Sequence, residues 1–366
     1  MNLRAIVSAS LVCLGISLHA QTAGEPPQVL PKVDVSANVP LVKVGDFKMR
    51  AARFAPAAVA DGDFIYIIGG QDTARGAMDS VERFNVRTGQ SEDFAKLKTG
   101  RFWHRAVIYS GKIYVLGGTN GRTGGVPDGD AAPPQGDLMA GRRAAQGSGI
   151  QDRAPEAFDL LEASVEIIDL ATGKVSAGVP MADARQQFGC AVLDDKIYVV
   201  GGKRAGPRGG VNTNDTQIFD LKRGKWSRGV AMPSPGDKVA TVVAPPGVIV
   251  VAGGYEGDHV LDSVEVFNPA DKIWRILPPL HRGVSAHSLV FLGHYLFLFG
   301  DYLSPDELVA YDLVTKHSEA FTLDYKRARH TAAVVHEGKA YVIGGRAVRD
   351  SESLDYIQVY ALRTKN

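Results

Sequence analysis

The stretch Lys112-Ile113-Tyr114-Val115-Leu116-Gly117-Gly118 is a short apolar strand that ends in two glycines. Edited copies of this stretch recur along the whole chain. They occupy residues 64–70, 196–202, 248–254, 295–300 and 339–345, and the fifth of the six copies ends in a single glycine. A strand that recurs at a regular interval indicates a repeat architecture, in which each copy belongs to one structural unit. The sequence therefore predicts six units.

Each of these strands lies between other strand-like runs. Upstream, an apolar run such as Ala106-Val107-Ile108 precedes a tight turn at Ser110-Gly111, as in a β-hairpin. Downstream, an alternating run such as Val165-Glu166-Ile167-Ile168 predicts a half-buried strand. A polar turn then leads to a fourth strand, which carries Trp226 or Trp274 in two units. Four short antiparallel strands per unit, without helical periodicity between them, describe one blade of a β-propeller.

The spacing of the glycines identifies the type of blade. Gly69 and Gly117 are 48 residues apart, and Gly202 and Gly254 are 52 residues apart, close to the roughly 50 residues of a kelch blade. With its di-glycines, the tyrosine three positions before them and the tryptophan of the outer strand, the chain resembles the kelch-repeat family. The resemblance covers about residues 41–362 and implies an all-β fold, a six-bladed kelch-type β-propeller.

The two ends of the repeat region predict how the ring closes. The last unit stops after its third strand, residues 357–362, and residues 39–47 form an extra strand-like run before the first unit. We predict that this N-terminal strand becomes the outer strand of the last blade, because such closure removes an exposed sheet edge. The alternative is an open array of six units with two unprotected edges.

The N-terminal residues predict export. Residues 1–20 contain Arg4, an apolar run over residues 5–18 and a small residue at Ala20, which is typical of a secretory signal peptide. We therefore expect a periplasmic or secreted protein. The apolar run is too short to span a bilayer, and no later run reaches the necessary length.

The remaining chain divides into a linker and the propeller. Residues 21–40 are rich in proline and alanine and predict a linker, and residues 41–366 predict the propeller. Residues 121–161 form a long loop insertion in the second blade, rich in glycine, alanine, proline and charges. This insertion is either a tolerated surface loop or a lid over a binding face, and it is a candidate contact for a protein partner. After removal of the signal, Cys190 is the single cysteine, so we expect no internal disulfide.

The composition narrows the class of partner. The chain has 366 residues, of which 45% are hydrophobic and 22% are charged, and its formal net charge is +1. These values are ordinary for a globular protein. The near-neutral charge argues against nucleic acid as a partner. The histidines lack the spacing of metal ligands, and the glycines end strands without opening a phosphate-binding helix, so we expect neither a metal nor a cofactor.

Basic residues occur in the entering segment of every blade. In an up-and-down blade, the loop that enters the first strand and the loop after the second strand emerge on the same side. Because the innermost strands converge on the axis, we expect these residues to surround the mouth of the central channel. The candidate ligand-binding residues are Arg53, Arg101, His104, Arg185, Lys238, Arg282, His287, Arg327, Arg329 and His330.

Three interpretations of this basic ring remain open. Guanidinium groups bind carboxylates bidentately, so the leading hypothesis is a binding module for an anionic small molecule or an acidic glycan. In the second interpretation, the arginines are structural and bond to loop carbonyls. In the third, the face is a protein–protein docking scaffold.

The chain also resembles the periplasmic sialic acid epimerase (mutarotase) family in its architecture, its length and the insertion after the second di-glycine. In that family, a Gly-Glu and a nearby arginine follow the strand of the third blade. The corresponding residues 202–208 contain Lys203 in place of the acid and Arg208 as the arginine. The resemblance implies a sugar-acid mutarotase or epimerase as an alternative function. Glu256, on the next blade, and Arg208 are then the candidate catalytic residues.

Overall fold

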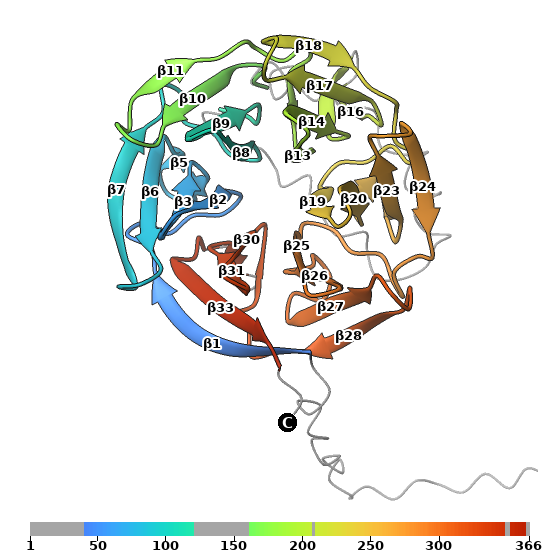
Figure 1. Ribbon diagram of the computed structural model, residues 1–366. Helices are drawn as coiled ribbons and strands as arrows, with labels where there is room; N and C mark the ends of the chain where they lie inside the picture. The colour runs from blue at the N-terminus through green and yellow to red at the C-terminus, as the bar shows by residue number, and fades with distance from the viewer. Residues whose placement is uncertain (1–39, 121–160, 207–208, 348–351, 364–366) are drawn as a thin grey trace, which may run out of the picture. The chain divides into compact units, whose positions relative to one another are not determined.

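The computed structural model describes residues 40–120, 161–206, 209–347 and 352–363. These residues belong to one compact unit, Val35–Asn366. Six four-stranded antiparallel sheets are arranged as blades around a central axis (Figure 1), which confirms the predicted all-β, six-bladed kelch-type propeller. The predicted signal peptide (1–20) lies outside the described residues, as do the linker (21–40) except residue 40 and the insertion (121–161) except residue 161.

Blades 1 to 5 each consist of four strands in chain order, with the innermost first. Blade 1 contains β2 (Ala57–Asp61), β3 (Phe64–Ile68), β6 (Ser80–Asn85) and β7 (Gln90–Lys96). Blade 2 contains β8 (Arg105–Tyr109), β9 (Lys112–Leu116), β10 (Val165–Asp169) and β11 (Val175–Ala177). Blade 3 contains β13 (Gly189–Leu193), β14 (Lys196–Val200), β17 (Thr216–Asp220) and β18 (Lys225–Arg228). Blade 4 contains β19 (Ala240–Ala244), β20 (Val248–Ala252), β23 (Val264–Asn268) and β24 (Ile273–Leu277). Blade 5 contains β25 (Ser288–Leu292), β26 (Tyr295–Phe299), β27 (Glu307–Asp312) and β28 (Ser318–Thr322).

The sixth blade joins the two ends of the propeller. It consists of β30 (Ala332–His336), β31 (Lys339–Ile343), β33 (Tyr356–Leu362) and, on its outer edge, the N-terminal strand β1 (Leu41–Lys48). The antiparallel register of β1 and β33 runs from the pair Leu41–Leu362 to the pair Lys48–Tyr356. In Figure 1 the first and last strands accordingly lie side by side. The predicted closure by the N-terminal strand is confirmed.

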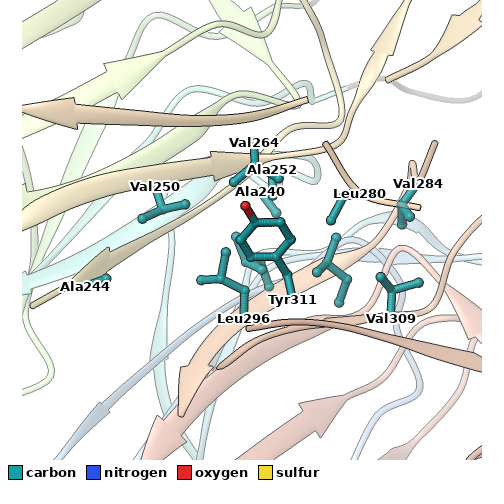
Figure 2. Close-up of a cluster of buried hydrophobic side chains, with 12 residues drawn as sticks. Ala240, Ala244, Val250, Ala252, Val264, Leu280, Val284, Leu296, Val309 and Tyr311 are labelled. Atoms are coloured by element: carbon teal, nitrogen blue, oxygen red, sulfur yellow. The ribbon is translucent and has the colours of Figure 1, made fainter. Parts of the chain in front are cut away.

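The hydrophobic core lies between neighbouring blades. Figure 2 shows one such layer, in which Val250 of β20 faces Leu296 of β26 and Tyr311 of β27. Because each blade packs against a neighbour on both of its faces, the second strand of a blade is buried along almost its whole length, as in β3 and β14. This double burial explains why the repeated stretch is a continuous apolar run.

The glycines that end the repeated stretch leave room for the next blade. Gly117 and Gly118 have φ angles of 60° and 89°, which favour glycine. A Cβ atom on Gly117 would lie 2.8 Å from the carbonyl oxygen of Arg185, in the segment that enters blade 3. The di-glycine therefore allows consecutive blades to approach closely at the axis.

Short hairpins cover the side of the ring on which the innermost strands begin. They are formed by β4 (Gln71–Asp72) with β5 (Gly76–Ala77), β15 (Lys203–Gly206) with β16 (Gly209–Asn212), and β21 (Tyr255–Glu256) with β22 (His259–Val260). On the same side, β12 (Arg185–Gln186) pairs with β15, and β29 (Ala328–Arg329) pairs with β32 (Arg346–Ala347). We call this side the mouth face.

No helix in the described residues is long and apolar enough to cross a membrane.

Candidate functional site

One residue of each entering segment adopts a left-handed backbone conformation at the mouth of the channel. The φ angles of these six residues lie between 50° and 57°. We call them the mouth ring, which consists of Ala55, Trp103, Gln187, Lys238, Ala286 and His330. An L-residue rarely adopts this conformation unless the surrounding structure fixes it.

Backbone hydrogen bonds connect members of the mouth ring from blade to blade. The amide of Trp103 donates to the carbonyl oxygen of Ala55 (3.2 Å), and the amide of Gln187 donates to that of Trp103 (3.0 Å). The amide of Ala55 donates to His330 (2.7 Å), and the amide of His330 donates to Ala286 (2.8 Å). These bonds run around the axis from blade 5 through blades 6, 1 and 2 to blade 3 and fix the ring members of these five blades.

The entering arginines of the first three blades do not line the channel mouth. Arg53, Arg101 and Arg185 each lie two residues before a member of the mouth ring, and all three are 0% exposed. The Nη1 atom of Arg101 donates to the carbonyl oxygen of Gly117 (3.1 Å), and its Nη2 atom donates to Glu166 Oε1 (2.7 Å). The structure therefore corrects the expected position of these three side chains.

The other two arginines repeat the same arrangement. Arg53 donates to the carbonyl oxygen of Gly69 (2.9 Å) and to Glu82. Arg185 donates to the carbonyl oxygen of Gly201 (3.0 Å) and pairs with Asp215 (2.7 Å).

The main chain of such an arginine bonds to the preceding blade. The amide of Arg101 donates to Met78 (3.0 Å), and its carbonyl oxygen accepts from the amide of Gly70 (2.9 Å). Both partners belong to blade 1, whereas Gly117 and Glu166 belong to blade 2. The arginine thus holds two blades together, as the structural interpretation of the sequence predicted.

The arginines of blades 5 and 6 occupy other positions. Arg282, four residues before Ala286, forms ion pairs with Asp301 (2.7 Å) and Glu307 (2.8 Å). Arg327 has a largely exposed side chain and pairs with Asp306 (3.0 Å). The predicted bases therefore do not share one topological position, and no continuous ring of guanidinium groups forms.

Two of the predicted histidines are buried directly after the mouth ring. His287 is hydrogen-bonded through Nε2 to the carbonyl oxygen of Ala252 in blade 4 (3.1 Å). Burial lowers its pKa from 6.5 to about 4 and lowers the pKa of His104 well below its ordinary value. His104 packs against Gly69, where an added Cβ would lie 2.8 Å from its ring. Both imidazoles are neutral packing groups between blades.

The remaining predicted bases meet aromatic side chains on the mouth face. Lys238 Nζ lies 4.7 Å from the ring centre of Tyr255 and 5.9 Å from that of Tyr302. Arg329 Cζ lies 4.5 Å from the ring centre of Tyr302. Apart from the buried His330, the side chains of this cluster are partly exposed. We call the cluster the mouth patch; it consists of Trp103, Lys238, Tyr255, Tyr302, Arg329 and His330.

The ring of His330 links the two halves of the mouth patch. The imidazole ring lies 6.0 Å from the indole ring of Trp103, and His330 directly follows Arg329 in the chain. Close by, Arg346 Cζ lies 5.3 Å from the ring centre of Phe54. The sequence prediction missed the aromatic members. Tyr255 and Tyr302 follow the glycines of their blades by one and two residues, and this spacing was the available signal.

The predicted catalytic pair stays a prediction. Glu256 is half-buried on β21, where it faces His259 across a hairpin, and Arg208 lies outside the described residues.

The described residues contain no group of three His, Cys, Asp or Glu side chains that could hold a metal ion. Cys190 lies on the innermost strand β13, and burial raises the pKa of its thiol to about 12.

Comparisons with known proteins match two parts of the repeat region. The kelch motif model matches residues 52–98, and the model of the KLHDC2/KLHL20/DRC7 kelch-repeats domain matches residues 159–301. Human Kelch-like protein 34 is 25% identical over 282 residues, which cover 75% of this chain and 39% of that protein. Kelch-like protein 40 of Xenopus tropicalis is 32% identical over 49% of this chain and 29% of that protein.

A third relative has a different printed name. Acyl-CoA-binding domain-containing protein 4 of Arabidopsis thaliana is 31% identical over 44% of this chain and 27% of that protein. The chain thus spans less than half the length of these curated relatives. The matched segments, together with the six four-stranded sheets, show that its repeats are kelch repeats and that the chain is a six-bladed kelch β-propeller.

Proposed function

We propose that the chain is a docking module, in which the mouth patch binds an acidic segment of a partner protein. The observation that carries this proposal is the meeting of cations and aromatic rings on one face, seen in the contacts of Lys238 with Tyr255 and of Arg329 with Tyr302.

The chemistry of the mouth patch suits such a segment. Tyrosine, tryptophan and arginine are enriched at protein interfaces, where they provide much of the binding energy. Lysine and arginine side chains on a partly exposed face are suited to bind the carboxylates of an acidic segment. The rings of Tyr255, Tyr302 and Trp103 offer apolar surface for the neighbouring side chains of the segment.

The predicted anionic small molecule or acidic glycan would use the same cations. Arg53, Arg101 and Arg185 are buried and form bonds within the propeller. The mouth face therefore has fewer cations than the sequence predicted for binding a compact, highly charged ligand. This favours an extended partner that also covers aromatic surface. The sugar-acid mutarotase remains the alternative from the enzyme class. Export rests on the signal peptide expected over residues 1–20, which lies outside the described residues, so export also stays a prediction.

The test is a binding experiment with two kinds of probe. Fluorescein-labelled peptides that combine several Asp or Glu residues with Leu or Ile are titrated by fluorescence polarisation, and N-acetylneuraminic and glucuronic acids are titrated by calorimetry. In the variant Lys238→Ala/Arg329→Ala, we expect peptide affinity to fall about ten-fold or more. The control is Arg223→Ala/Arg228→Ala, which removes two exposed charges of blade 3.

The outcomes separate the candidate functions. Peptide binding that is weakened by the mouth variant and retained in the control supports docking. Peptide binding that is equal in both variants overturns the proposal. Saturable binding of a sugar acid without peptide binding would instead favour the small-molecule function, and exchange NMR of its anomers would then test for mutarotase activity.

A further inference from the structure

A second candidate site centres on Arg105, which follows Trp103 of the mouth ring by two residues. Arg105 is the first residue of β8 in blade 2. Its Nη1 atom donates to the carbonyl oxygen of His104 (3.2 Å), and its Nη2 atom donates to the carbonyl oxygen of Val239 (3.3 Å). Val239 directly precedes β19 of blade 4.

Arg105 and its hydrogen-bond partner Val239 belong to blades that are not neighbours. Blade 3 separates blade 2 from blade 4, and its innermost strand β13 contacts both β8 and β19 (Figure 1). A side chain that connects Arg105 with Val239 must therefore pass in front of β13, through the central channel. The guanidinium group of Arg105 accordingly lies in the channel.

The charge of Arg105, a half-buried residue, is not balanced as the charges of the three fully buried arginines are. Arg53, Arg101 and Arg185 each form an ion pair with a carboxylate. Arg105 forms no ion pair with Asp or Glu in the part of the chain that the structure describes. Burial lowers its pKa, and the nearby group that opposes this effect is the thiol of Cys190, which is neutral at pH 7.

The guanidinium group of Arg105 also has N–H donors that its two hydrogen bonds do not use. It carries five N–H donors, of which two are used by the carbonyl oxygens of His104 and Val239. The remaining donors are the Nε–H and one N–H on each terminal nitrogen. Nε and a terminal nitrogen together form the planar fork that binds an oxyanion bidentately.

We propose that Arg105 is an oxyanion-binding residue and that the channel takes a small oxyanion, either a carboxylate or a phosphate, at this position. The anion would supply the negative charge that the described protein residues do not provide. This site is distinct from the mouth patch in its cation, because it uses Arg105 of β8, whereas the cations of the mouth patch are Lys238 and Arg329 of the entering segments.

The experiment uses the full chain with sodium phosphate and sodium acetate as probes, at constant ionic strength set with sodium chloride. Binding is followed through the Nε–Hε signals of arginine in ¹H–¹⁵N NMR spectra, with Arg105 assigned by the variant Arg105→Lys. Calorimetry gives the dissociation constant. We expect a saturable shift of the Arg105 signal, and binding weakened about ten-fold or more in Arg105→Met. Arg329→Met distinguishes this site from the mouth patch, and the exposed Arg223→Met is the matched control.

Each outcome decides between the two sites. A saturable shift of the Arg105 signal, with binding lost in Arg105→Met and kept in Arg329→Met, supports the channel site even if the mouth patch binds no peptide. A signal that does not move with either anion overturns the proposal. Binding lost in Arg329→Met and kept in Arg105→Met also overturns it and assigns the anion to the mouth patch. If Arg105→Met fails to fold, the wild-type signal and Arg105→Lys still decide the question.

Discussion

The backbone amide of Ala55 donates a 2.7 Å hydrogen bond to the carbonyl oxygen of His330. Ala55 enters the first blade and His330 enters the last, so this bond joins the two blades near the axis. The pairing of β1 with β33 closes the same junction at the rim. The first and last blades are therefore joined at two separate radii without a disulfide.

Removal of β1 should open the ring at the rim. We expect a chain that begins at Met49 to be less stable than one that begins at Pro40, because β33 becomes an exposed edge strand that can pair with other chains. Thermal unfolding and size-exclusion chromatography provide the measurements. A shortened chain that stays monomeric with an unchanged melting temperature would show that β1 is dispensable.

Loss of the Arg101 side chain should destabilise the fold. In Arg101→Met, the buried carboxylate of Glu166 loses its cation, and we expect a loss of about 3–5 kcal/mol in the free energy of unfolding, measured with urea. Adding Glu166→Gln should restore part of it, because blade 3 carries Gln217 at the corresponding position and bonds it to the amide of Ala182 (2.9 Å). The exposed control Arg223→Met should change stability by about 0.5 kcal/mol or less. Equal losses in Arg101→Met and Arg223→Met would contradict the structural role.

The stability of the propeller should fall as the pH is lowered through the range of its buried histidines. His287 has a pKa of about 4 in the folded chain and an ordinary value of 6.5 when unfolded. Below pH 6.5 the unfolded state binds the extra proton, so the stabilisation is complete above pH 6.5 and is lost as the pH falls to about 4. The loss is on the order of 3 kcal/mol, and His104 acts in the same direction.

The pH dependence is checked by urea unfolding at several pH values between 4 and 8. The variant His287→Gln should flatten the profile, whereas the exposed His317→Gln should keep it. An unchanged profile in His287→Gln would assign the acid sensitivity to other groups.

Deletion of residues 124–155 should leave the propeller folded. The isolated bridge between Thr119 and Leu161 joins the two ends of the insertion, and β9 pairs with β10 beyond it. We expect a melting temperature close to that of the full chain and the loss of any partner that binds through the insertion, detected by pull-down. A deletion variant that unfolds would show that this segment contributes to stability.

The fold could be predicted from short stretches of sequence, because each propeller blade is built from a continuous segment of the chain. The strands of each blade are consecutive in the chain, and the double burial of the second strand produces the apolar run before Gly117-Gly118. Even the closure was predictable, since residues 357–362 leave the last blade one strand short and residues 39–47 supply it.

The site was less predictable, because the sequence gives the type of a side chain and not its direction. Arg101 and Arg329 are both bases of an entering segment. Arg101 points inward, where it bonds the buried carboxylate of Glu166 and the carbonyl oxygen of Gly117, while Arg329 lies over Tyr302.

The amino-acid sequence by itself determined the number of blades, their order and their closure, because spacing and burial period are properties of the chain. The tertiary structure alone decided which bases lie at the mouth. It also decided that Arg105 of blade 2 bonds to Val239 of blade 4, because only the closed ring brings these two blades within reach of one side chain.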